Sequence, residues 1–366
     1  MYILMKKFAV IMAGGSGLRF WPKTKEKLPK QFIHLYGDGT LIQNTFKRLE
    51  TYFSMEDIYV VVNEAFSFLV KEQLPDLPND NIIIEPFGKN TAPALGLVST
   101  ILSQRYSDED IMLAFPADQE ISNLGEFFNS LDVAIEAAHS KDSIVTIGIA
   151  PTRPETQFGY IQFNENRNSL GELFDNGVRF CTTFAEKPDL ETAKRFIESG
   201  DFLWNSGIVV VKMNIFKEAY SEYLPYYFEQ LNTLKDYIST DKYDEALEKI
   251  YMKFNPISID YAILEKSDKV LVVMSSFSWS DLGNWDELYR LSLKDARNNV
   301  IEGEVISINS SNSLIISNKN LICIAGIEDI IVVEGDDSLL ICKRGQSEQV
   351  QELIEIMRKK QLKKYL

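Results

Sequence analysis

The residues FAVIMAGGSGLRFWPKTKEKLPKQ, at positions 8–31, are the most informative segment of this 366-residue chain. Its first five residues are apolar β-formers, which is typical of a buried parallel strand. A glycine-rich turn follows at once, with Gly14, Gly15 and Gly17 around Ser16. Because glycine has no Cβ, backbone N–H groups in such a turn can close on a phosphate. The segment therefore predicts a strand that ends in a phosphate-binding loop.

The loop differs from the two best-known phosphate loops. A G-x-G-x-x-G fingerprint that starts at Gly15 would need a third glycine where the chain has Phe20. A Walker A loop would need Lys-Ser/Thr after its last glycine, where Leu18 and Arg19 stand. Arg19 and Lys30 instead bring positive charge close to the glycines. This combination favours a polyphosphate ligand, and the alternative is an ordinary glycine turn between a strand and a helix.

The composition is that of a globular protein with an acidic balance. Apolar residues make up 45% of the chain and charged residues 25%, and the formal net charge is −15. DNA and RNA binding needs a basic surface, so no nucleic-acid partner is expected. The apolar run near the N-terminus is too short for a secretory signal, and no run approaches a membrane span. The three cysteines are far apart and odd in number, which suits a reducing cytoplasm.

Strand-like and helix-like segments alternate through residues 7–151. Strand candidates are residues 8–12, 58–63, 82–85, 111–118 and 143–151, and helix candidates are residues 42–53, 92–106 and 127–138. The alternation predicts a Rossmann-like α/β fold with a mixed, mostly parallel sheet and helices on both faces. Ligands of such sheets bind beyond the carboxyl ends of the strands. We therefore expect the glycine loop, Glu85 and Asp118 on one rim.

The sequence pattern changes at residue 298. Residues 152–297 continue the mixed pattern, so we expect one domain over residues 1–297. From residue 298 onward, short strands recur about every ten residues and end at Gly, Asn, Asp or Ser, which is typical of a small β-solenoid or sandwich. We expect residues 298–366 to form a small β-helix-like domain with a C-terminal helix. The apolar residues on one face of that helix, which pack on this domain or on a second subunit, are Val350, Leu353, Ile354 and Met357.

Two aspartates are candidate metal ligands. Asp118 ends the strand-like FPADQ, and Asp281 in FSWSDLGNWDEL follows the strand-like VLVVMSS. A lone aspartate in such a place is more often a helix cap or a turn residue. Two of them beside a phosphate loop suit Mg²⁺, which takes one or two protein carboxylates and completes its shell with phosphate oxygens and water.

The motifs resemble those of the sugar-nucleotide pyrophosphorylases, also called sugar-1-phosphate nucleotidylyltransferases. The family signature is G-G-x-G-x-R, a proline and then P-K-Q, and FWPKTKEKLPKQF looks like the mannose-1-phosphate guanylyltransferase branch. P-A-D-x, F-x-E-K-P, WNSG and W-x-D-x-G follow in order, and the resemblance spans residues 7–290. The chain departs from the branch at Thr24-Lys25, at Lys89 and at Gln119, where Ser-Arg, arginine and histidine are usual.

The resemblance implies a set of site residues. Arg19, Lys30 and Lys187 would be catalytic, and Asp118 and Asp281 would hold Mg²⁺. The implied nucleotide-binding residues are Ala13, Gly14, Gly15, Ser16, Gly17, Glu85, Asn90, Thr91 and Pro116. The implied sugar-phosphate-binding residues are Gly159, Tyr160, Glu186, Lys187, Asn205, Gly207 and Asp260. Two of these motifs have structural alternatives. Glu-Lys-Pro is also common in surface turns. The sequence around Asp260 is equally consistent with the start of a helix that is capped by Ser258.

The implied reaction joins GTP and mannose 1-phosphate into GDP-mannose, with release of pyrophosphate. A sugar phosphate is mostly dianionic at neutral pH, so no general base is needed, in agreement with a chain that has two histidines. Longer family members carry an isomerase domain, so this chain is expected to be monofunctional, with a homodimer through its C-terminal region. The alternatives are a relative with another nucleotide or sugar, such as a heptose, and a non-catalytic regulatory subunit. A metal-dependent glycosyltransferase would need a D-x-D pair, which Ala117-Asp118-Gln119 lacks.

Overall fold

The structure, a computed structural model, describes residues 5–15, 17–167 and 169–366. Two compact units make up the fold. The first takes the residues up to Gly14, Thr45–Ala117 and Ile121–Trp279. The second takes Gly15–Asn44, Asp118–Glu120 and Ser280–Leu366. The domain boundary at residue 297 follows the change of sequence pattern, and it stays a prediction.

The first unit is built on a mixed sheet with the strand order β3-β2-β1-β4-β9-β6-β10-β8-β7. Strands β3, β2, β1 and β4 pair in parallel, as do β6 and β10, whereas β9 is antiparallel to β4, β6 and β7. The bounds are β1 Lys7–Met12, β2 Ile58–Asn63, β3 Ile82–Glu85, β4 Ile111–Pro116, β6 Ile144–Ile149, β7 Gly159–Asn164, β8 Val178–Glu186, β9 Phe202–Lys212 and β10 Val270–Ser275. The mixed sheet expected from the alternating pattern is therefore present.

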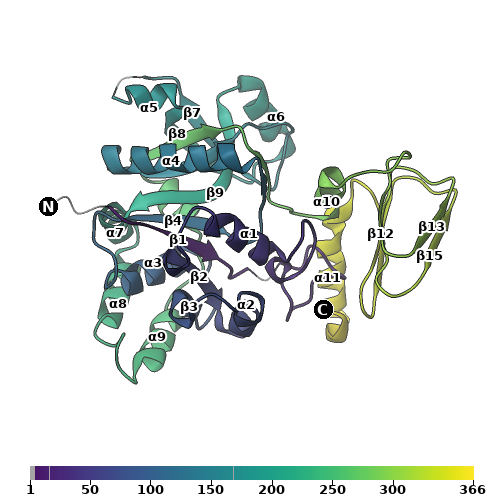
Figure 1. The fold of residues 1–366 in the computed structure, drawn as a ribbon, viewed down its shortest axis with the longest axis horizontal. Coiled ribbons are helices and arrows are strands. Elements are labelled where there is room, and N and C mark those ends of the chain that lie inside the picture. Colours follow the sequence, from purple (N-terminus) through teal and green to yellow (C-terminus); the bar gives the residue numbers. More distant parts are fainter. Residues whose placement is uncertain (1–4, 16, 168) are drawn as a thin grey trace. The chain divides into compact units, whose positions relative to one another are not determined.

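Helices cover both faces of this sheet (Figure 1). They are α1 Leu41–Glu50, α2 Ser67–Gln73, α3 Thr91–Leu102, α4 Leu124–Lys141, α5 Glu172–Asp175, α6 Leu190–Ser199, α7 Met213–Tyr223, α8 Pro225–Leu234 and α9 Tyr243–Met252. Phe8 and Val10 of β1 share one buried cluster with side chains of α3, α7, α8 and α9. Phe115 of β4 contacts Phe127 of α4 on the other face. Alternate residues of each strand thus supply two separate apolar layers.

The carboxyl ends of the parallel strands meet at one edge of the sheet. Strand pairing sets Met12 beside Pro116 and Asn63 beside Glu85. The N–H of Ala13 extends β1 by donating to the carbonyl of Val61 at 2.9 Å. The first residues of the glycine loop therefore leave the sheet at the edge that also carries Glu85 and Pro116.

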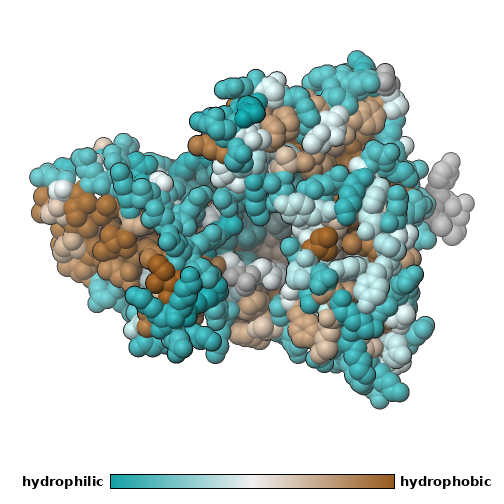
Figure 2. Space-filling model, turned by 180° about the vertical axis from the view of Figure 1, so that it is seen from behind, coloured by the Kyte–Doolittle hydropathy of each residue, from teal (hydrophilic) through white to brown (hydrophobic). Residues whose placement is uncertain are grey.

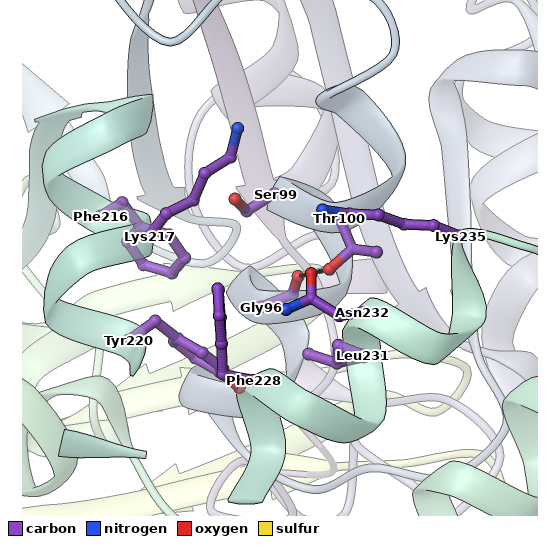
Figure 3. Close-up of a pocket in the computed structure, with 10 residues that line it drawn as sticks. All are labelled: Gly96, Ser99, Thr100, Phe216, Lys217, Tyr220, Phe228, Leu231, Asn232 and Lys235. Atoms are coloured by element: carbon purple, nitrogen blue, oxygen red, sulfur yellow. Dashed lines mark hydrogen bonds between the residues drawn. The ribbon is translucent and has the colours of Figure 1, made fainter. Parts of the chain in front are cut away.

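The helical layer of α3, α7 and α8 encloses a cavity of about 20 Å³, which has room for a single water molecule (Figure 3). Gly96 of α3 is required here, because a Cβ at this position would lie 2.3 Å from the Tyr220 hydroxyl oxygen. The Thr100 hydroxyl donates to the Gly96 carbonyl at 2.8 Å, as Figure 3 shows. This small cavity belongs to the packing of the helices.

The second unit contains a small β-helix. Its elements are α10 Trp285–Leu291, β12 Val300–Glu302, β13 Val305–Ile308, β14 Leu314–Ile316, β15 Ile322–Ala325, β16 Ile330–Glu334, β17 Leu339–Lys343 and α11 Val350–Lys359. Leu314 pairs in parallel with Ile331, and Val305 with Ile322, in each case seventeen residues further along the chain. Parallel pairing at a constant offset is typical of stacked coils. Two short strands, β5 Glu120–Ser122 and β11 Ser278–Ser280, lie where the chain passes from one unit to the other.

Helix α11 packs within the second unit. Val350 and Ile354 are buried in a cluster with β-helix side chains, and Met357 packs against that cluster. Leu353 is 41% exposed, so the predicted apolar face is narrower than expected. Trp21 of the FWP motif lies in the same cluster, and its indole N–H donates to the Tyr365 carbonyl at 2.7 Å. The motif after the glycine loop is therefore part of the second unit.

None of the helices in the described part of the chain combines the length and the apolar character needed to cross a membrane.

Candidate active site

Lys30, Asp118, Asp281 and Arg19 form a charged group in the second unit, and Lys30 contacts two of its members. It is 8% exposed, and its ammonium contacts Asp118 Oδ2 at 2.9 Å and the Asp281 carbonyl oxygen at 2.5 Å. Its neighbour Gln31 donates to the carbonyl of Gly15 at 2.8 Å, which holds one residue of the glycine loop. Three motifs that are far apart in the sequence, P-K-Q, P-A-D and W-x-D-x-G, are thereby brought together.

Asp118 and Asp281 suit a single divalent cation. The two carboxylates belong to the same charged group, since Lys30, Asp118 and Arg19 all act electrostatically on Asp281. Two carboxylates match what Mg²⁺ takes from a protein when phosphates and water fill its remaining positions. No group of three or more His, Cys, Asp or Glu side chains in the described residues is arranged to hold a metal. Asp118 and Asp281 could therefore hold a divalent cation only if its remaining ligands come from outside these two side chains.

Asp281 sits in a tightly held turn. Leu282, the next residue, has a φ of 45°, which is rare for a bulky side chain and is typical of functional sites. The Ser280 hydroxyl accepts the N–H of Leu282 at 3.1 Å and donates to Glu287 Oε1 at 2.6 Å. Burial raises the pKa of Asp281 to about 6, against the opposing effect of the Lys30 ammonium. The turn thus holds a partly buried carboxylate beside a buried cation.

Glu85 lies at the end of β3 in the first unit and is 2% exposed. Its Oε1 accepts the Tyr251 hydroxyl at 3.1 Å, and its Oε2 would lie 3.4 Å from a Cβ placed on Gly14. Burial raises the pKa of Glu85 to about 7, and the Tyr251 hydrogen bond partly offsets this rise. A Cβ on Gly88 would lie 3.4 Å from Asn63 Nδ2. The Glu85 carboxylate therefore lies beside Gly14, and Gly88 lies beside Asn63 and the main chain of Gly14.

Asn90 and Thr91 hold the start of α3. Asn90 has a φ of 72°, and its side chain accepts the N–H of Thr91 at 2.8 Å. The Thr91 hydroxyl accepts the N–H of Ile259 at 2.8 Å. The Ile257 N–H donates to the Lys89 carbonyl at 3.1 Å. These contacts give both predicted nucleotide-binding residues a structural part to play, and they fix the segment that follows Glu85.

Glu186 at the end of β8, Asn205 on β9 and Asp260 in the segment before β10 form a polar group. Asn205 Nδ2 donates to Asp260 Oδ1 at 2.7 Å, and Asn205 Oδ1 accepts the N–H of Gly207 at 3.0 Å. A Cβ on Gly159 would lie 2.5 Å from Glu186 Oε2, so only glycine allows Glu186 its position. Burial, and then the charge of Asp260, raises the pKa of Glu186. These four predicted residues and Gly207 are brought together.

Lys187 directly follows β8 and has an unusual backbone conformation. Its φ is 49°, its ammonium lies 3.4 Å from Glu186 Oε1, and its side chain is 53% exposed. A strained backbone with an exposed cation is consistent with a ligand-binding role. Tyr160 differs, because its ring is fully buried and its hydroxyl accepts the N–H of Glu155 at 2.9 Å. Any contribution of Tyr160 to a site would come from its main chain.

The remaining predicted residues have simpler positions. Pro116 ends β4 opposite Met12. Gly17 lies close to Lys30, since a Cβ on it would be 3.8 Å from Lys30 Cβ. Arg19 acts on Asp281 through its charge. Ser16 lies outside the described residues.

Three residues that lie beside Glu85 or Gly14 were not predicted from the sequence: Asn63, Gly88 and Tyr251. Gly88 lies within the EPFGKN stretch, where an isolated glycine signals a close approach of the backbone. Asn63 ends β2, and its register beside Glu85 follows only from the sheet pairing. Tyr251 belongs to an amphipathic helix far away in the sequence, and nothing in its local pattern distinguishes it from a core tyrosine.

Known proteins resemble this chain over most of its length. A family model described as nucleotidyl transferase matches residues 8–298, and one described as a MannoseP isomerase/GMP-like beta-helix domain matches residues 303–357. A mannose-1-phosphate guanylyltransferase of Escherichia coli is 34% identical over 353 residues, covering 94% of this chain and 74% of that protein. Mannose-1-phosphate guanylyltransferase 2 of Escherichia coli O157:H7 is 35% identical, covering 98% of this chain and 75% of that protein.

A solved structure is similar over almost the whole chain. It is described as a mannose-1-phosphate geranyltransferase from Thermus thermophilus, with a TM-score of 0.85 and 28% identity. The match covers 97% of this chain and 100% of that one. Together with the two family models, it confirms the predicted α/β fold with a small β-helix-like domain.

Proposed function

The chain belongs to the nucleotidyl transferase family, in its mannose-1-phosphate guanylyltransferase branch, and from this we propose that it transfers GMP from GTP to α-D-mannose 1-phosphate. The products are GDP-mannose and pyrophosphate. The observation that carries the proposal is the contact of Lys30 with both Asp118 and the Asp281 main chain, because it assembles cation and carboxylates as phosphate transfer requires. We assign this chemistry to the domain over residues 1–297.

The glycine loop, Arg19 and Lys30 bind the phosphates of GTP in this proposal. The loop residues Gly14, Gly15, Ser16 and Gly17 offer main-chain N–H groups, and the two cations neutralise the triphosphate. Asp118 and Asp281 would hold Mg²⁺, which supplies additional positive charge to phosphate oxygens when bound. Lys30 and Arg19 then stabilise the charge that develops on pyrophosphate as it leaves.

The bond changes are those of an in-line substitution at phosphorus. An oxygen of the mannose phosphate attacks the α-phosphorus of GTP, and the bond from that phosphorus to the bridging oxygen breaks. Pyrophosphate carries away the electron pair, and the new bond is the diphosphate linkage of GDP-mannose. The attacking phosphate is already ionised, so neither His34 nor His139 is needed as a base.

Glu85 recognises guanine in this proposal. Guanine presents N1–H and N2–H on one edge, and a carboxylate accepts both, whereas uracil and thymine offer one N–H between two carbonyl groups. A buried carboxylate with little competition from water gives such hydrogen bonds a large share in selectivity. Ala13, Asn90, Thr91 and Pro116 would contribute main-chain contacts around the base and ribose.

The polar group of Glu186, Asn205 and Asp260, together with Lys187, binds mannose 1-phosphate in this proposal. Lys187, strained and exposed, would pair with the phosphate. Glu186 and Asp260 would accept hydrogen bonds from sugar hydroxyls, and Asn205 could accept or donate them. The main chains of Gly159, Tyr160 and Gly207 would line the same pocket. The alternative of a regulatory subunit without catalysis is disfavoured, because Arg19, Lys30, Asp118, Lys187 and Asp281 are all present.

A homodimer through the C-terminal region is part of the proposal. Figure 2 shows apolar side chains gathered on the surface of the β-helix. Its exposed large apolar residues include Ile301, Ile306, Ile308, Leu321, Leu339 and Ile341. Exposed apolar clusters of this kind are typical of interaction surfaces. We also propose a cytoplasmic enzyme, since the three cysteines are free thiols.

A substrate panel tests the proposed specificity. The purified chain is assayed with GTP, UTP and dTTP against mannose 1-phosphate, glucose 1-phosphate and a heptose 1-phosphate, with Mg²⁺ present. We expect the highest kcat/KM for GTP with mannose 1-phosphate. A preference for a pyrimidine nucleotide would overturn the role of Glu85, and a preference for another sugar phosphate would overturn the choice of mannose.

A further inference from the structure

Tyr251 of α9 contacts a proposed binding group although it belongs to none of the motifs. Its hydroxyl lies 3.1 Å from Glu85 Oε1 and 3.2 Å from the carbonyl oxygen of Pro93. Its side chain is fully buried. Within the part of the chain that the structure describes, it is the side chain that donates a hydrogen bond to the Glu85 carboxylate. The contact joins positions 166 residues apart.

The two oxygens of Glu85 face different surroundings. Oε1 faces Tyr251, whereas Oε2 faces the start of the glycine loop, where a Cβ on Gly14 would lie 3.4 Å away. A carboxylate has about four lone-pair positions and Tyr251 supplies a single proton, so acceptor capacity remains for a ligand. The hydrogen bond to Oε1 restrains the rotation of the carboxylate.

Tyr251 also anchors the segment that follows β3. Its hydroxyl oxygen also lies 3.2 Å from the Pro93 carbonyl oxygen in the first turn of α3, so its one proton is shared between this carbonyl and Glu85 Oε1. Tyr220 of α7 makes a parallel contact, since its hydroxyl donates to the carbonyl of Ala92 at 3.2 Å. Both tyrosines thus contact main-chain carbonyls at the start of α3, and of the two Tyr251 also donates to Glu85.

We infer that Tyr251 is a positioning residue for base selection, which orients the Glu85 carboxylate so that it accepts the N–H donors of guanine. The inference rests on the proposed reading of guanine by Glu85. Burial raises the pKa of Tyr251 well above its usual value of 10, so the phenol stays a donor throughout the working range. Tyr220 and Tyr243, the other titratable groups beside this pair, also have raised pKa values and stay neutral.

The test compares Tyr251→Phe with Tyr220→Phe as the matched control. Both variants remove one buried hydroxyl from the same apolar cluster (Tyr220 is seen in Figure 3). In Tyr251→Phe we expect KM for GTP to rise about tenfold while kcat stays at the wild-type value. The acid limb of kcat/KM for GTP should move to higher pH, because Glu85 loses the donor that favours its ionised form. Tyr220→Phe should keep the wild-type KM and acid limb.

Glu85→Gln, measured alongside, separates this inference from the proposed function. If Glu85→Gln raises KM for GTP and Tyr251→Phe does not, the positioning role is wrong and the base assignment stands. If Glu85→Gln leaves KM for GTP unchanged, the proposed role of Glu85 fails and the inference fails with it.

A second variant covers the case in which Tyr251→Phe does not fold. Replacement of Tyr251 by 3-fluorotyrosine keeps the ring and makes the hydroxyl a stronger donor. The acid limb of kcat/KM for GTP should then move to lower pH. An unchanged limb in this variant would overturn the positioning role.

Discussion

Asp281 and Glu85 are carboxylates in places where burial disfavours charge, and burial raises the pKa of both. A neighbouring group offsets the cost in each case: the Lys30 ammonium beside Asp281, and the Tyr251 hydroxyl beside Glu85. Such residues destabilise the free protein and are retained where a ligand uses their charge. The two positions therefore make the sharpest single-residue predictions.

Asp281→Asn should abolish nucleotidyl transfer and leave the fold intact, because the amide has a similar shape and removes the charge that Mg²⁺ requires. Asp286→Asn is the matched control in the same segment. Asp286 accepts hydrogen bonds from the Gly345 N–H at 2.6 Å and from Ser347, so its loss should cost about 1–3 kcal/mol of stability.

Steady-state turnover and thermal melting measure the two variants. Asp286→Asn should melt at a lower temperature and keep its turnover per folded molecule. Near-normal turnover in Asp281→Asn would remove the metal assignment.

Glu85 predicts a pH dependence of nucleotide binding. Its pKa of about 7 in the free protein means that the accepting, ionised form prevails only above that pH. The affinity for GDP-mannose, whose diphosphate stays ionised throughout, should therefore rise as the pH increases from 6 to 8, and calorimetric titration at a series of pH values measures it. Glu85→Gln should bind more weakly and show no such rise. A wild-type affinity that stays constant across this range would contradict the role of Glu85.

The same shift predicts a trade-off with stability. Because the pKa of Glu85 is raised from 4.5 to about 7, the folded state binds the proton more tightly, and stability falls as the pH rises through this window. Glu85→Gln should therefore be more stable than the wild type at pH 8, by up to about 3 kcal/mol, with little difference at pH 4.5. Denaturant titrations at both pH values measure this, and equal differences at the two values would count against it.

At the scale of elements, turns and straps hold the candidate site in place. The segment that contains Ile257 and Ile259 is hydrogen-bonded to Lys89, Thr91 and Ala92, next to the proposed base-reading residue. The following residue, Asp260, accepts from Asn205 in the proposed sugar-binding group. Ser258 also caps this turn by accepting the N–H of Tyr261 at 3.3 Å. This segment therefore links two proposed binding groups of the first unit. Ser258 caps the turn as the helix-start alternative expects, and a binding role of Asp260 stays a prediction.

Glu334 predicts an acid-sensitive turn in the β-helix. Its carboxylate accepts the backbone N–H groups of Asn318, Lys319 and Asn320, and these hydrogen bonds lower its pKa to about 2. A depressed pKa adds stability above the unfolded value of 4.5, and this stability is lost as the pH falls towards 2. Glu334→Gln should melt at a lower temperature than the wild type at pH 7, and the gap should close on acidification. A gap that does not depend on pH would show that the charge of Glu334 is not what holds the turn.

Sequence predicted those parts of the site that local motifs encode. Lys30, Asp118 and Asp281 each stand in a short motif, and the structure brings the three together. The Glu85–Tyr251 contact could not be predicted from the sequence, because it depends on how α9 packs in the fold and no local motif contains both residues. The buried ring of Tyr160 was missed for a related reason: alternation in β7 does not say which face holds the core.

At the scale of the whole molecule, the sequence pattern predicted the α/β sheet and the β-helix because each repeats a simple period. Apolar runs alternate with amphipathic helices in the first, and short strands recur with turn residues in the second. The antiparallel insertion of β9 and the inclusion of Gly15–Asn44 in the second unit are not periodic features. Both follow from long-range packing, in which Phe20 and Trp21 join the apolar cluster of Trp285 and Ile354.

The fate of labelled phosphate tests the proposed reaction most directly. The purified chain is incubated with mannose 1-phosphate, Mg²⁺ and GTP that carries ³²P at either the α or the β position. If GMP is transferred, the α label appears in GDP-mannose and the β label leaves in pyrophosphate. Recovery of the β label in the sugar product, or retention of both labels in GTP, would contradict nucleotidyl transfer by this protein.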